Sequence, residues 1–369
     1  MPIQYEQSTV HTPDGFALTL FRHRPAVSRP QLVGEARPVL LLPGFGSNRF
    51  TFGVHRHHGL PEILAESGRD VWIGELRGSR SARWLGSGKP VIDVDAKRLL
   101  DVPAIVEHIC RETGAERVDL IGHSLGGLIA LLVAGGSDGH RIGRVATLAT
   151  PGTFKGVVGG LEASGPLFRG LAKGVESVFG KIDTLGIAPL ARTRGPLPHL
   201  FAFQRHFLPG ACTTEERRLY LDHAIEAIHG TELAQLTRWV REGCLTDRHG
   251  RSLEPLLQAV TQPVLVTTAT RDRVVTEAMA YAVYAKIGSH DKHFRIIGRE
   301  HGATCDYAHA DFILSHAARR DVLEPVAEWL GRVEARRGAA RVEEVRDARH
   351  EARTHRPTTQ RSLRVVGAK

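Results

Sequence analysis

The chain of 369 residues is long enough for two domains or for one α/β core with an insertion, and its 42% hydrophobic content excludes general disorder. Its net charge of +9 gathers near the C-terminus, because residues 332–369 hold eleven Lys or Arg and five Asp or Glu. The remainder carries only +3, so no nucleic-acid partner is expected. We expect residues 336–369 to form a disordered basic tail, with at most weak contact to an anionic membrane surface.

Cellular location is inferred from three features. The first seven residues contain neither a basic nor an apolar segment, so we expect no secretory signal and a cytoplasmic protein. The most apolar stretch, 118–136, is interrupted by Asp119, His123 and Ser124, and no membrane span is expected. The four cysteines are Cys110, Cys212, Cys244 and Cys305. They show no Cys-x-x-Cys spacing, so reduced thiols are expected.

In the first part of the chain, short apolar runs alternate with segments of helical periodicity. The alternating run 16–22 predicts an edge strand, and the continuously apolar run 38–42 predicts a buried one. The elements expected next are a helix over 59–67, a strand over 70–75, a helix over 97–113, a strand from 118 and a strand over 142–149. Strands that alternate with helices predict an α/β fold with a mostly parallel sheet and helices on both faces.

The strand pattern stops at residue 151 and returns near residue 260. The elements expected from there on are helices over 214–229 and 231–242, strands over 263–270 and 293–297, and a helix over about 318–335. We therefore predict a core made of 1–150 and 261–335, with 151–260 inserted as a helical cap. The apolar face of the second cap helix is expected to pack on the core or to line an acyl pocket.

One motif lies where the central strand passes into a helix. The segment Gly122-His-Ser124-Leu-Gly126 follows the apolar run from Val118 and precedes another apolar run. Small residues on either side of a serine at such a junction allow a strained turn that exposes the hydroxyl, which is called a nucleophile elbow. The alternative is a glycine-rich helix start in which Ser124 is an N-cap.

A serine hydroxyl needs a base to take its proton and a carboxylate to orient that base. Asp272 lies just past the strand over 263–270, where loops at the carboxyl edge of a sheet carry functional groups. It could instead be a surface residue paired with Arg271 or Arg273. His301 and His309 both follow the last strand, and local features leave either possible as the base.

These residues resemble a known family. The elbow, the loop at Asp272 and the segment Asp306-Tyr-Ala-His309-Ala-Asp-Phe-Ile are similar to the α/β-hydrolase superfamily, in particular to the acid-lipase branch and to bacterial lipase-like hydrolases. The resemblance covers about 38–150 and 260–331. It implies that His309 is the base, with His301 as the alternative. It also implies that the N–H groups of Phe45 and Leu125 hold the oxyanion.

Two departures from the family pattern stand out. Pro43-Gly44 replaces the usual His-Gly of the oxyanion loop, which matters little if the loop acts through its backbone. The interval from Asp272 to His309 is longer than usual, and this keeps His301 open as the base.

The resemblance implies a serine hydrolase that cleaves a carboxylic ester or lipid with an apolar acyl part, without a metal or organic cofactor. Two alternatives remain: an acyltransferase that uses the same residues, and a non-catalytic protein that holds a lipid or small molecule. The histidines at 55, 57 and 58 lack carboxylates at ligand-like spacing, so we expect an exposed loop there rather than a metal site.

Overall fold

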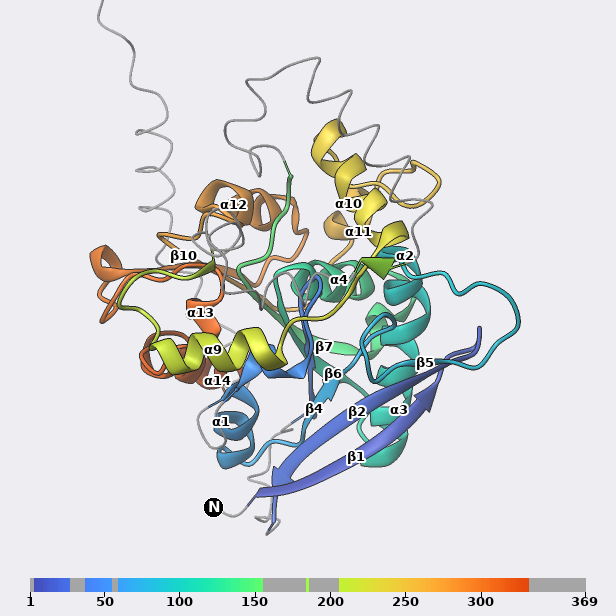
Figure 1. Cartoon of the computed structure of the whole chain (residues 1–369), viewed down its shortest axis with the longest axis horizontal. Coiled ribbons are helices and arrows are strands. Elements are labelled where there is room, and N and C mark those ends of the chain that lie inside the picture. The colour runs from blue at the N-terminus through green and yellow to red at the C-terminus, as the bar shows by residue number, and fades with distance from the viewer. Residues whose placement is uncertain (1–2, 27–36, 55–58, 155–183, 186–205, 332–369) are drawn as a thin grey trace, which may run out of the picture. The chain divides into compact units, whose positions relative to one another are not determined.

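The computed structural model describes residues 3–26, 37–54, 59–154, 184–185 and 206–331 (Figure 1). Its strands are β1 (Ile3–His11), β2 (Phe16–Pro25), β3 (Val39–Leu42), β4 (Val71–Gly74), β5 (Arg83–Trp84), β6 (Val118–His123), β7 (Ile142–Leu148), β8 (Thr184–Leu185), β9 (Ile228–His229), β10 (Val264–Ala269) and β11 (Lys292–Ile297). Its α-helices are α1 (Leu60–Glu66), α2 (Val94–Ala96), α3 (Val102–Thr113), α4 (Leu125–Ala134), α9 (Thr214–His223), α10 (Gly230–Glu242), α11 (Glu254–Gln258), α12 (Glu277–Lys286), α13 (Asp311–Leu314) and α14 (Glu324–Gly331).

Shorter helical turns connect some of these elements. The 3-10 turns are Arg49–Phe52, Ser137–Arg141 and Arg299–His301, and the π-helical turns are Lys97–Asp101 and Arg319–Leu323. The two π-helical turns precede α3 and α14 directly, so the helices expected over 97–113 and 318–335 each begin with a wider turn.

The described strands form one nine-stranded sheet, with β8 and β9 as a separate pair (Figure 1). The strand order is β1-β2-β4-β3-β6-β7-β10-β11, and β5 pairs with β2. All neighbours from β4 to β11 are parallel, whereas β2 is antiparallel to β1, β4 and β5. The predicted mostly parallel sheet is confirmed. The edge position predicted for 16–22 is wrong, because β1 lies outside β2.

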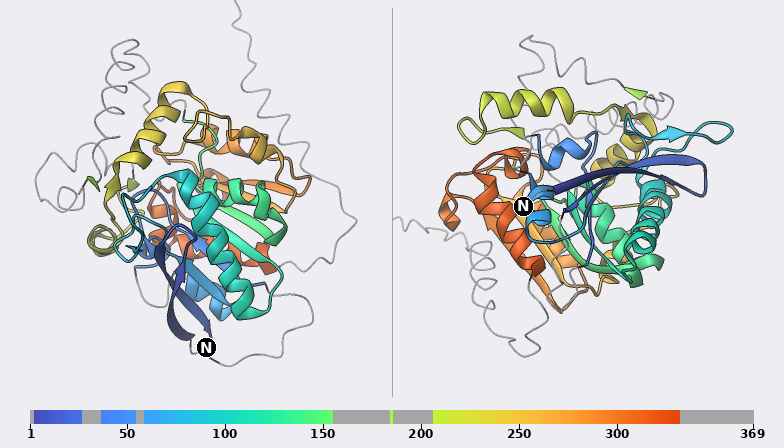
Figure 2. Two further views of the ribbon diagram at one scale, coloured as in Figure 1. Left: turned by 90° about the vertical axis from the view of Figure 1, so that its right-hand side faces the viewer. Right: turned by 90° about the horizontal axis from the view of Figure 1, so that it is seen from below.

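Both faces of the sheet are covered by helices. Val39 and Leu41 of β3 belong to a buried cluster with α1 and α14, and Leu40 and Leu42 belong to another with α3 and α4. Since side chains alternate between the faces of a strand, a strand buried on both faces reads as a continuous apolar run. Figure 2 shows these two helix groups on opposite sides of the strands.

The described part of the expected cap, residues 206–260, packs directly on the core. Trp239 of α10 is fully buried in the cluster that contains α3 and α4, and Tyr220 of α9 packs in a smaller cluster with Ala310 and Leu314. The helix predicted over 214–229 ends earlier, at His223, because the following residues are extended and pair with another loop. The cap boundaries at 151 and 260 stay predictions.

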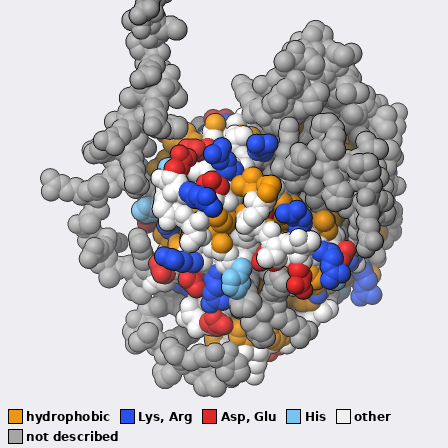
Figure 3. Space-filling model, turned by 60° about the vertical axis from the view of Figure 1, so that its left-hand side comes forward, with side chains coloured by type: hydrophobic (Ala, Val, Ile, Leu, Met, Phe, Trp, Pro, Cys, Tyr) orange, Lys and Arg blue, Asp and Glu red, His pale blue; other side chains and the backbone are white. Residues whose placement is uncertain are grey.

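The four cysteines all lie in the described residues and form no disulfide: Cys110 and Cys212 are buried, Cys305 is half-buried and Cys244 is exposed. None of the described helices is long and apolar enough to cross a membrane. Across the same residues, no three His, Cys, Asp or Glu side chains gather as metal ligands would. The face drawn in Figure 3 carries basic and acidic side chains interspersed. The expected tail and the histidines at 55–58 lie outside the described residues.

Candidate active site

Ser124 lies in a strained turn between the end of β6 and the start of α4. Its φ is +53°, a value that a residue other than glycine rarely adopts and that the surroundings must enforce. The Ser124 N–H donates to the carbonyl of Leu148 at 2.8 Å, and the Thr150 hydroxyl donates to the carbonyl of Ser124 at 3.0 Å. These two bonds fix the serine backbone from the neighbouring strand β7.

The glycine at position 126 allows α4 to begin against the end of β3. A Cβ atom there would lie 2.2 Å from the carbonyl oxygen of Leu42 and 2.4 Å from that of Pro43, closer than any side chain permits. The first turn of α4, with Leu125 as its first residue, therefore adjoins the loop that follows β3. The N–H groups of such a turn have no partner inside the helix and favour negative charge.

The loop after β3 also contacts the serine itself. A Cβ atom built on Gly44 would lie 3.1 Å from the Cβ atom of Ser124, which shows that the backbone before Phe45 runs directly beside the serine. The structure thus brings the loop that carries Phe45 and the residue Leu125 next to Ser124.

His309 and Asp272 form a buried hydrogen-bonded pair. The Nδ1 atom of His309 lies 2.7 Å from Oδ2 of Asp272, and both side chains are almost fully buried. The other carboxylate oxygen, Oδ1, accepts the N–H groups of Val274 and Val275, each at 2.8 Å. Because an ionised carboxylate only accepts, Nδ1 is the donor of this hydrogen bond, and in the neutral imidazole the lone pair is then on Nε2.

The ring of His309 lies next to the serine turn. Its centroid is 4.7 Å from that of His123, the residue that precedes Ser124, and Nε2 of His123 is 3.2 Å from the carbonyl oxygen of His309. Among the described residues, no hydrogen bond joins the Ser124 hydroxyl to His309. Catalytic hydrogen bonds are often long in empty sites and shorten when a substrate binds.

The other candidate histidine, His301, is on the surface. It ends the 3-10 turn after β11, its side chain is 39% exposed, and its acidic neighbour is Glu300 at 3.8 Å. The structure therefore brings His309, and not His301, to Asp272. Asp272 is buried, so it is not the surface residue that could have paired with Arg271 or Arg273.

Comparison with known proteins identifies the fold family. A family model described as alpha/beta hydrolase fold matches residues 37–304. The chain belongs to the α/β-hydrolase fold family. The matched residues include Ser124 and Asp272, and they end shortly before His309.

Similar curated proteins match only part of this α/β-hydrolase. A probable lipase of Schizosaccharomyces pombe is 32% identical over 130 residues, which are 33% of this chain and 28% of that protein. Sterol esterase 2 of Saccharomyces cerevisiae is 30% identical over 34% of this chain and 24% of its own. Gastric triacylglycerol lipase of Mus musculus is 26% identical over 41% of this chain. The match spans at most 40% of the length of these three relatives.

Solved structures share the fold over nearly the whole chain. A thermophilic esterase from Thermogutta terrifontis has a TM-score of 0.59 and 17% identity, over 89% of this chain and 100% of that one. An enol-lactonase from Burkholderia xenovorans has a TM-score of 0.54 and 16% identity, over 88% of this chain and 100% of that one. At such identities the likeness concerns the fold alone.

His123 is a site residue that the sequence analysis did not single out. Burial lowers the pKa of its imidazole well below the usual value, and the nearby ring of His309 lowers it further. The ring is therefore neutral, and its Nε2–H donates to the His309 carbonyl. Its position in the sequence could have indicated this role, since the residue before an elbow serine ends the central strand inside the core.

Arg77, in the turn after β4, is also buried in this α/β-hydrolase. Its side chain forms ion pairs with Asp101 at 2.7 Å and with Asp14 at 2.8 Å. Asp101 also accepts the backbone N–H of Arg77 at 2.9 Å. These contacts hold the turn after β4 in place, so the role of Arg77 is structural.

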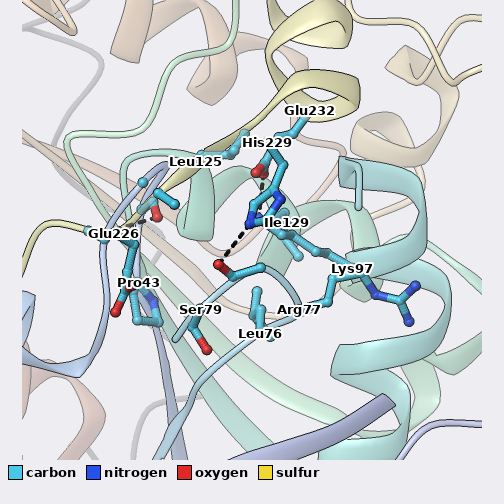
Figure 4. A pocket seen from close by; sticks show the side chains of 15 residues that line it. Pro43, Leu76, Arg77, Ser79, Lys97, Leu125, Ile129, Glu226, His229 and Glu232 are labelled. Atoms are coloured by element: carbon cyan, nitrogen blue, oxygen red, sulfur yellow. Dashed lines mark hydrogen bonds and ion pairs between the residues drawn. The ribbon is translucent and has the colours of Figure 1, made fainter. Parts of the chain in front are cut away.

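A small cavity lies beside the loop after β3 (Figure 4). Its volume is about 30 Å³, which is room for one or two water molecules. It is bounded by Gly44 and Ser47 of that loop, by Leu125 of α4, and by Glu226 and His229 from the cap. The His229 ring is hydrogen-bonded to the carbonyl of Gly78 at 2.9 Å, and Lys97 pairs with Glu232 nearby (Figure 4).

The apolar residues expected to pack on the core or to line an acyl pocket lie outside this cavity. Leu236 and Trp239 are buried in the core, where the indole N–H of Trp239 donates to the carbonyl of Thr246 at 2.7 Å. Of the two roles expected for this face of α10, core packing is the one that the structure supports.

Proposed function

We propose that this α/β-hydrolase cleaves carboxylic esters by acyl transfer to water, with Ser124 as the nucleophile. The observation that carries the proposal is the hydrogen bond between His309 and Asp272 beside the strained turn of Ser124. An imidazole held by a carboxylate at Nδ1 presents its Nε2 lone pair as a base. The curated relatives named as lipases and a sterol esterase support an ester with an apolar acyl part.

In the proposed reaction, Nε2 of His309 takes the proton of the Ser124 hydroxyl as the oxygen attacks the ester carbonyl. The tetrahedral oxyanion is held by the N–H groups of Phe45 and Leu125, the second of which lies at the positive end of α4. Collapse of this intermediate expels the alcohol, which takes the proton from His309. Water, deprotonated by the same ring, then hydrolyses the acyl-enzyme.

Asp272 keeps one tautomer of His309 in place and stabilises the imidazolium that forms during each step. Its second oxygen is held by Val274 and Val275, so the carboxylate itself is fixed. The neutral His123 ring adds a bond to the main chain of His309. The whole cycle needs only groups of this chain and water.

The proposal is tested with purified protein in two assays. A fluorophosphonate probe should label the wild type and leave the Ser124→Ala variant unlabelled, because only an activated serine reacts. A series of p-nitrophenyl esters from acetate to palmitate should show turnover that Ser124→Ala lowers by about 10³-fold or more. Folded protein that neither reacts with the probe nor cleaves any ester would overturn the proposal and favour a binding protein.

The same assays separate hydrolysis from acyl transfer. With an added alcohol, a hydrolase releases mainly the free acid, whereas an acyltransferase forms a new ester. The acyl-length series also reports which chains the site accepts, which matters because the cavity beside the loop after β3 holds only a few atoms.

A further inference from the structure

A segment of the cap pairs with the loop that follows β3. Between α9 and β9, the chain is extended, and Ile225 forms an antiparallel bridge with Ser47. The N–H of Asn48 donates to the carbonyl of Ala224 at 3.2 Å, and the N–H of Glu226 donates to the carbonyl of Gly46 at 2.8 Å. The loop that contains Phe45 therefore has a backbone partner in the cap, far away in the sequence.

Side chains strengthen this pairing. The Nδ2 group of Asn48 donates to Oε1 of Glu226 at 2.6 Å and to the carbonyl of His223 at 2.8 Å. The Oδ1 atom of Asn48 accepts the N–H of Phe50 at 3.0 Å, which starts the 3-10 turn after the loop. Every polar atom of the Asn48 side chain is thus used, and the orientation of the amide is fixed.

Glu226 connects three parts of the molecule. It is 5% exposed, and besides Asn48 it accepts the backbone N–H of Arg80 at 3.2 Å and the Nε–H of Arg80 at 2.8 Å. Figure 4 shows Glu226 at the cavity, with Pro43 of the loop after β3 nearby. A buried carboxylate with three donors holds its partners firmly, because a buried charge left without partners is strongly destabilising.

We infer that Glu226 is a positioning residue that holds the loop of residues 43–48 through Asn48, so that the N–H of Phe45 faces the substrate oxygen. This inference rests on the proposed function, since that function gives the loop its role. Oxyanion donors act at a defined distance from the reacting oxygen, and a shift of about 1 Å costs about 10²-fold in rate. Glu226 itself does not touch the reacting atoms in this scheme.

Two single substitutions disturb this network without changing its shape. In Asn48→Asp, a carboxylate oxygen replaces Nδ2 and faces the carboxylate of Glu226, while the acceptor for Phe50 is kept. In Glu226→Gln, an amide N–H₂ in place of Oε1 leaves Asn48 and the Nε–H of Arg80 without their acceptor, and one in place of Oε2 leaves the backbone N–H of Arg80 without its acceptor. Each variant should lower kcat for p-nitrophenyl butyrate by about 10- to 100-fold, with KM changed by no more than about threefold.

The double variant Asn48→Asp with Glu226→Gln exchanges donor and acceptor across the same contact. The amide introduced at position 226 can then donate to the carboxylate introduced at position 48, so kcat should recover by about tenfold from that of Asn48→Asp. The matched control is Glu216→Gln, the same change at a buried carboxylate that accepts the N–H groups of Thr213 and His316, away from the loop. That control should keep kcat within about threefold.

Hydrogen exchange of peptides that cover residues 43–48 gives a second readout that needs no activity. Exchange should be faster in both single variants and slower again in the double variant, with little change in Glu216→Gln. The inference is overturned if neither single variant lowers kcat more than Glu216→Gln at equal folded fraction, or if exchange stays the same. If Asn48→Asp does not fold, the comparison of Glu226→Gln with Glu216→Gln tests the inference. If the wild type has no esterase activity, the proposed function is refuted. The exchange data then test by themselves whether Glu226 holds the loop of residues 43–48.

Discussion

One carboxylate oxygen of Asp272 lies 2.7 Å from Nδ1 of His309, and the other accepts two backbone N–H groups. Asp272 therefore faces donors on both sides, and an amide at this position cannot accept on both. In Asp272→Asn, the N–H₂ group turned toward His309 would favour the tautomer with the proton on Nε2, which cannot act as a base. We expect kcat for p-nitrophenyl butyrate to fall by about 10³- to 10⁴-fold, measured by steady-state kinetics.

Asp306→Asn is the control for that substitution. Asp306 is a half-buried carboxylate on a nearby loop, where it accepts the N–H of Arg299 at 3.0 Å and the hydroxyl of Thr270 at 3.2 Å. Its replacement should leave kcat within about threefold. An Asp272→Asn variant that keeps more than about a tenth of the wild-type kcat would contradict the role given to Asp272.

The two candidate histidines should respond differently to replacement by alanine. His309→Ala removes the group bound to Asp272, and turnover should fall by about 10³-fold or more. His301→Ala removes an exposed side chain beside Glu300, so turnover should stay within about threefold. Both are measured with the same ester and with the rate of fluorophosphonate labelling. The reverse order of effects would assign the base to His301.

Glu75 makes folding stability depend on pH. The pKa of its carboxyl is raised from 4.5 to about 7, mainly by burial and in part by the nearby Glu226 carboxylate. The N–H of Arg49, which donates at 3.1 Å, and the charges of Arg49 and Arg80 oppose the rise. Because the folded state holds this proton more tightly than the unfolded chain does, the stability that it contributes is complete below pH 4.5 and is lost as the pH rises through about 7.

Glu75→Gln removes this titration. Relative to the wild type, the variant should gain on the order of 3 kcal/mol of unfolding free energy between pH 4.5 and pH 8, measured by urea denaturation. The same substitution at exposed Glu66 controls for the loss of a negative charge. If the stability curves of the wild type and Glu75→Gln are parallel across this pH range, Glu75 has the same pKa in the folded and unfolded states, which would contradict the prediction.

Gly126→Ala should disturb the protein strongly. The added Cβ would lie 2.2 Å from the carbonyl oxygen of Leu42, so either α4 or the loop after β3 must shift. We expect a loss of about 3 kcal/mol or more in thermal or urea unfolding, together with lower esterase activity. Gly331→Ala is the control, since a Cβ at that position meets nothing within 4 Å. Equal stability of the two variants would contradict the close approach described at Gly126.

Sequence patterns predicted the buried strands well because these strands are apolar on both faces. The run that became β3 is continuously apolar and those that became β6 and β10 are largely so, and the ends of β6 and β10 placed Ser124 and Asp272 at one edge of the sheet. Strand β1 was missed because it is mostly exposed, and its only buried side chain is that of Val10. The edge position was consequently given to β2 in error.

The remaining differences arise from contacts between distant segments. Residues 225–229 have a helix-like composition, but Ile225 pairs with the loop after β3 and Ile228–His229 pair with β8, so they leave the helix, and this also hid the role of Glu226. The choice between His301 and His309 could not come from local features, since both follow β11. Family resemblance favoured His309, and the structure adds its contact with Asp272.

The strand order has a practical consequence for preparations of this protein. Ser124 follows β6, whereas Asp272 and His309 follow β10 and β11, so the three groups meet only after the later strands have joined the earlier ones in the sheet. In the proposed mechanism, a chain that is misfolded in its last third would keep the serine but lose the groups that activate it. Covalent titration of Ser124 would therefore count native molecules and would distinguish them from soluble aggregates that a concentration assay includes.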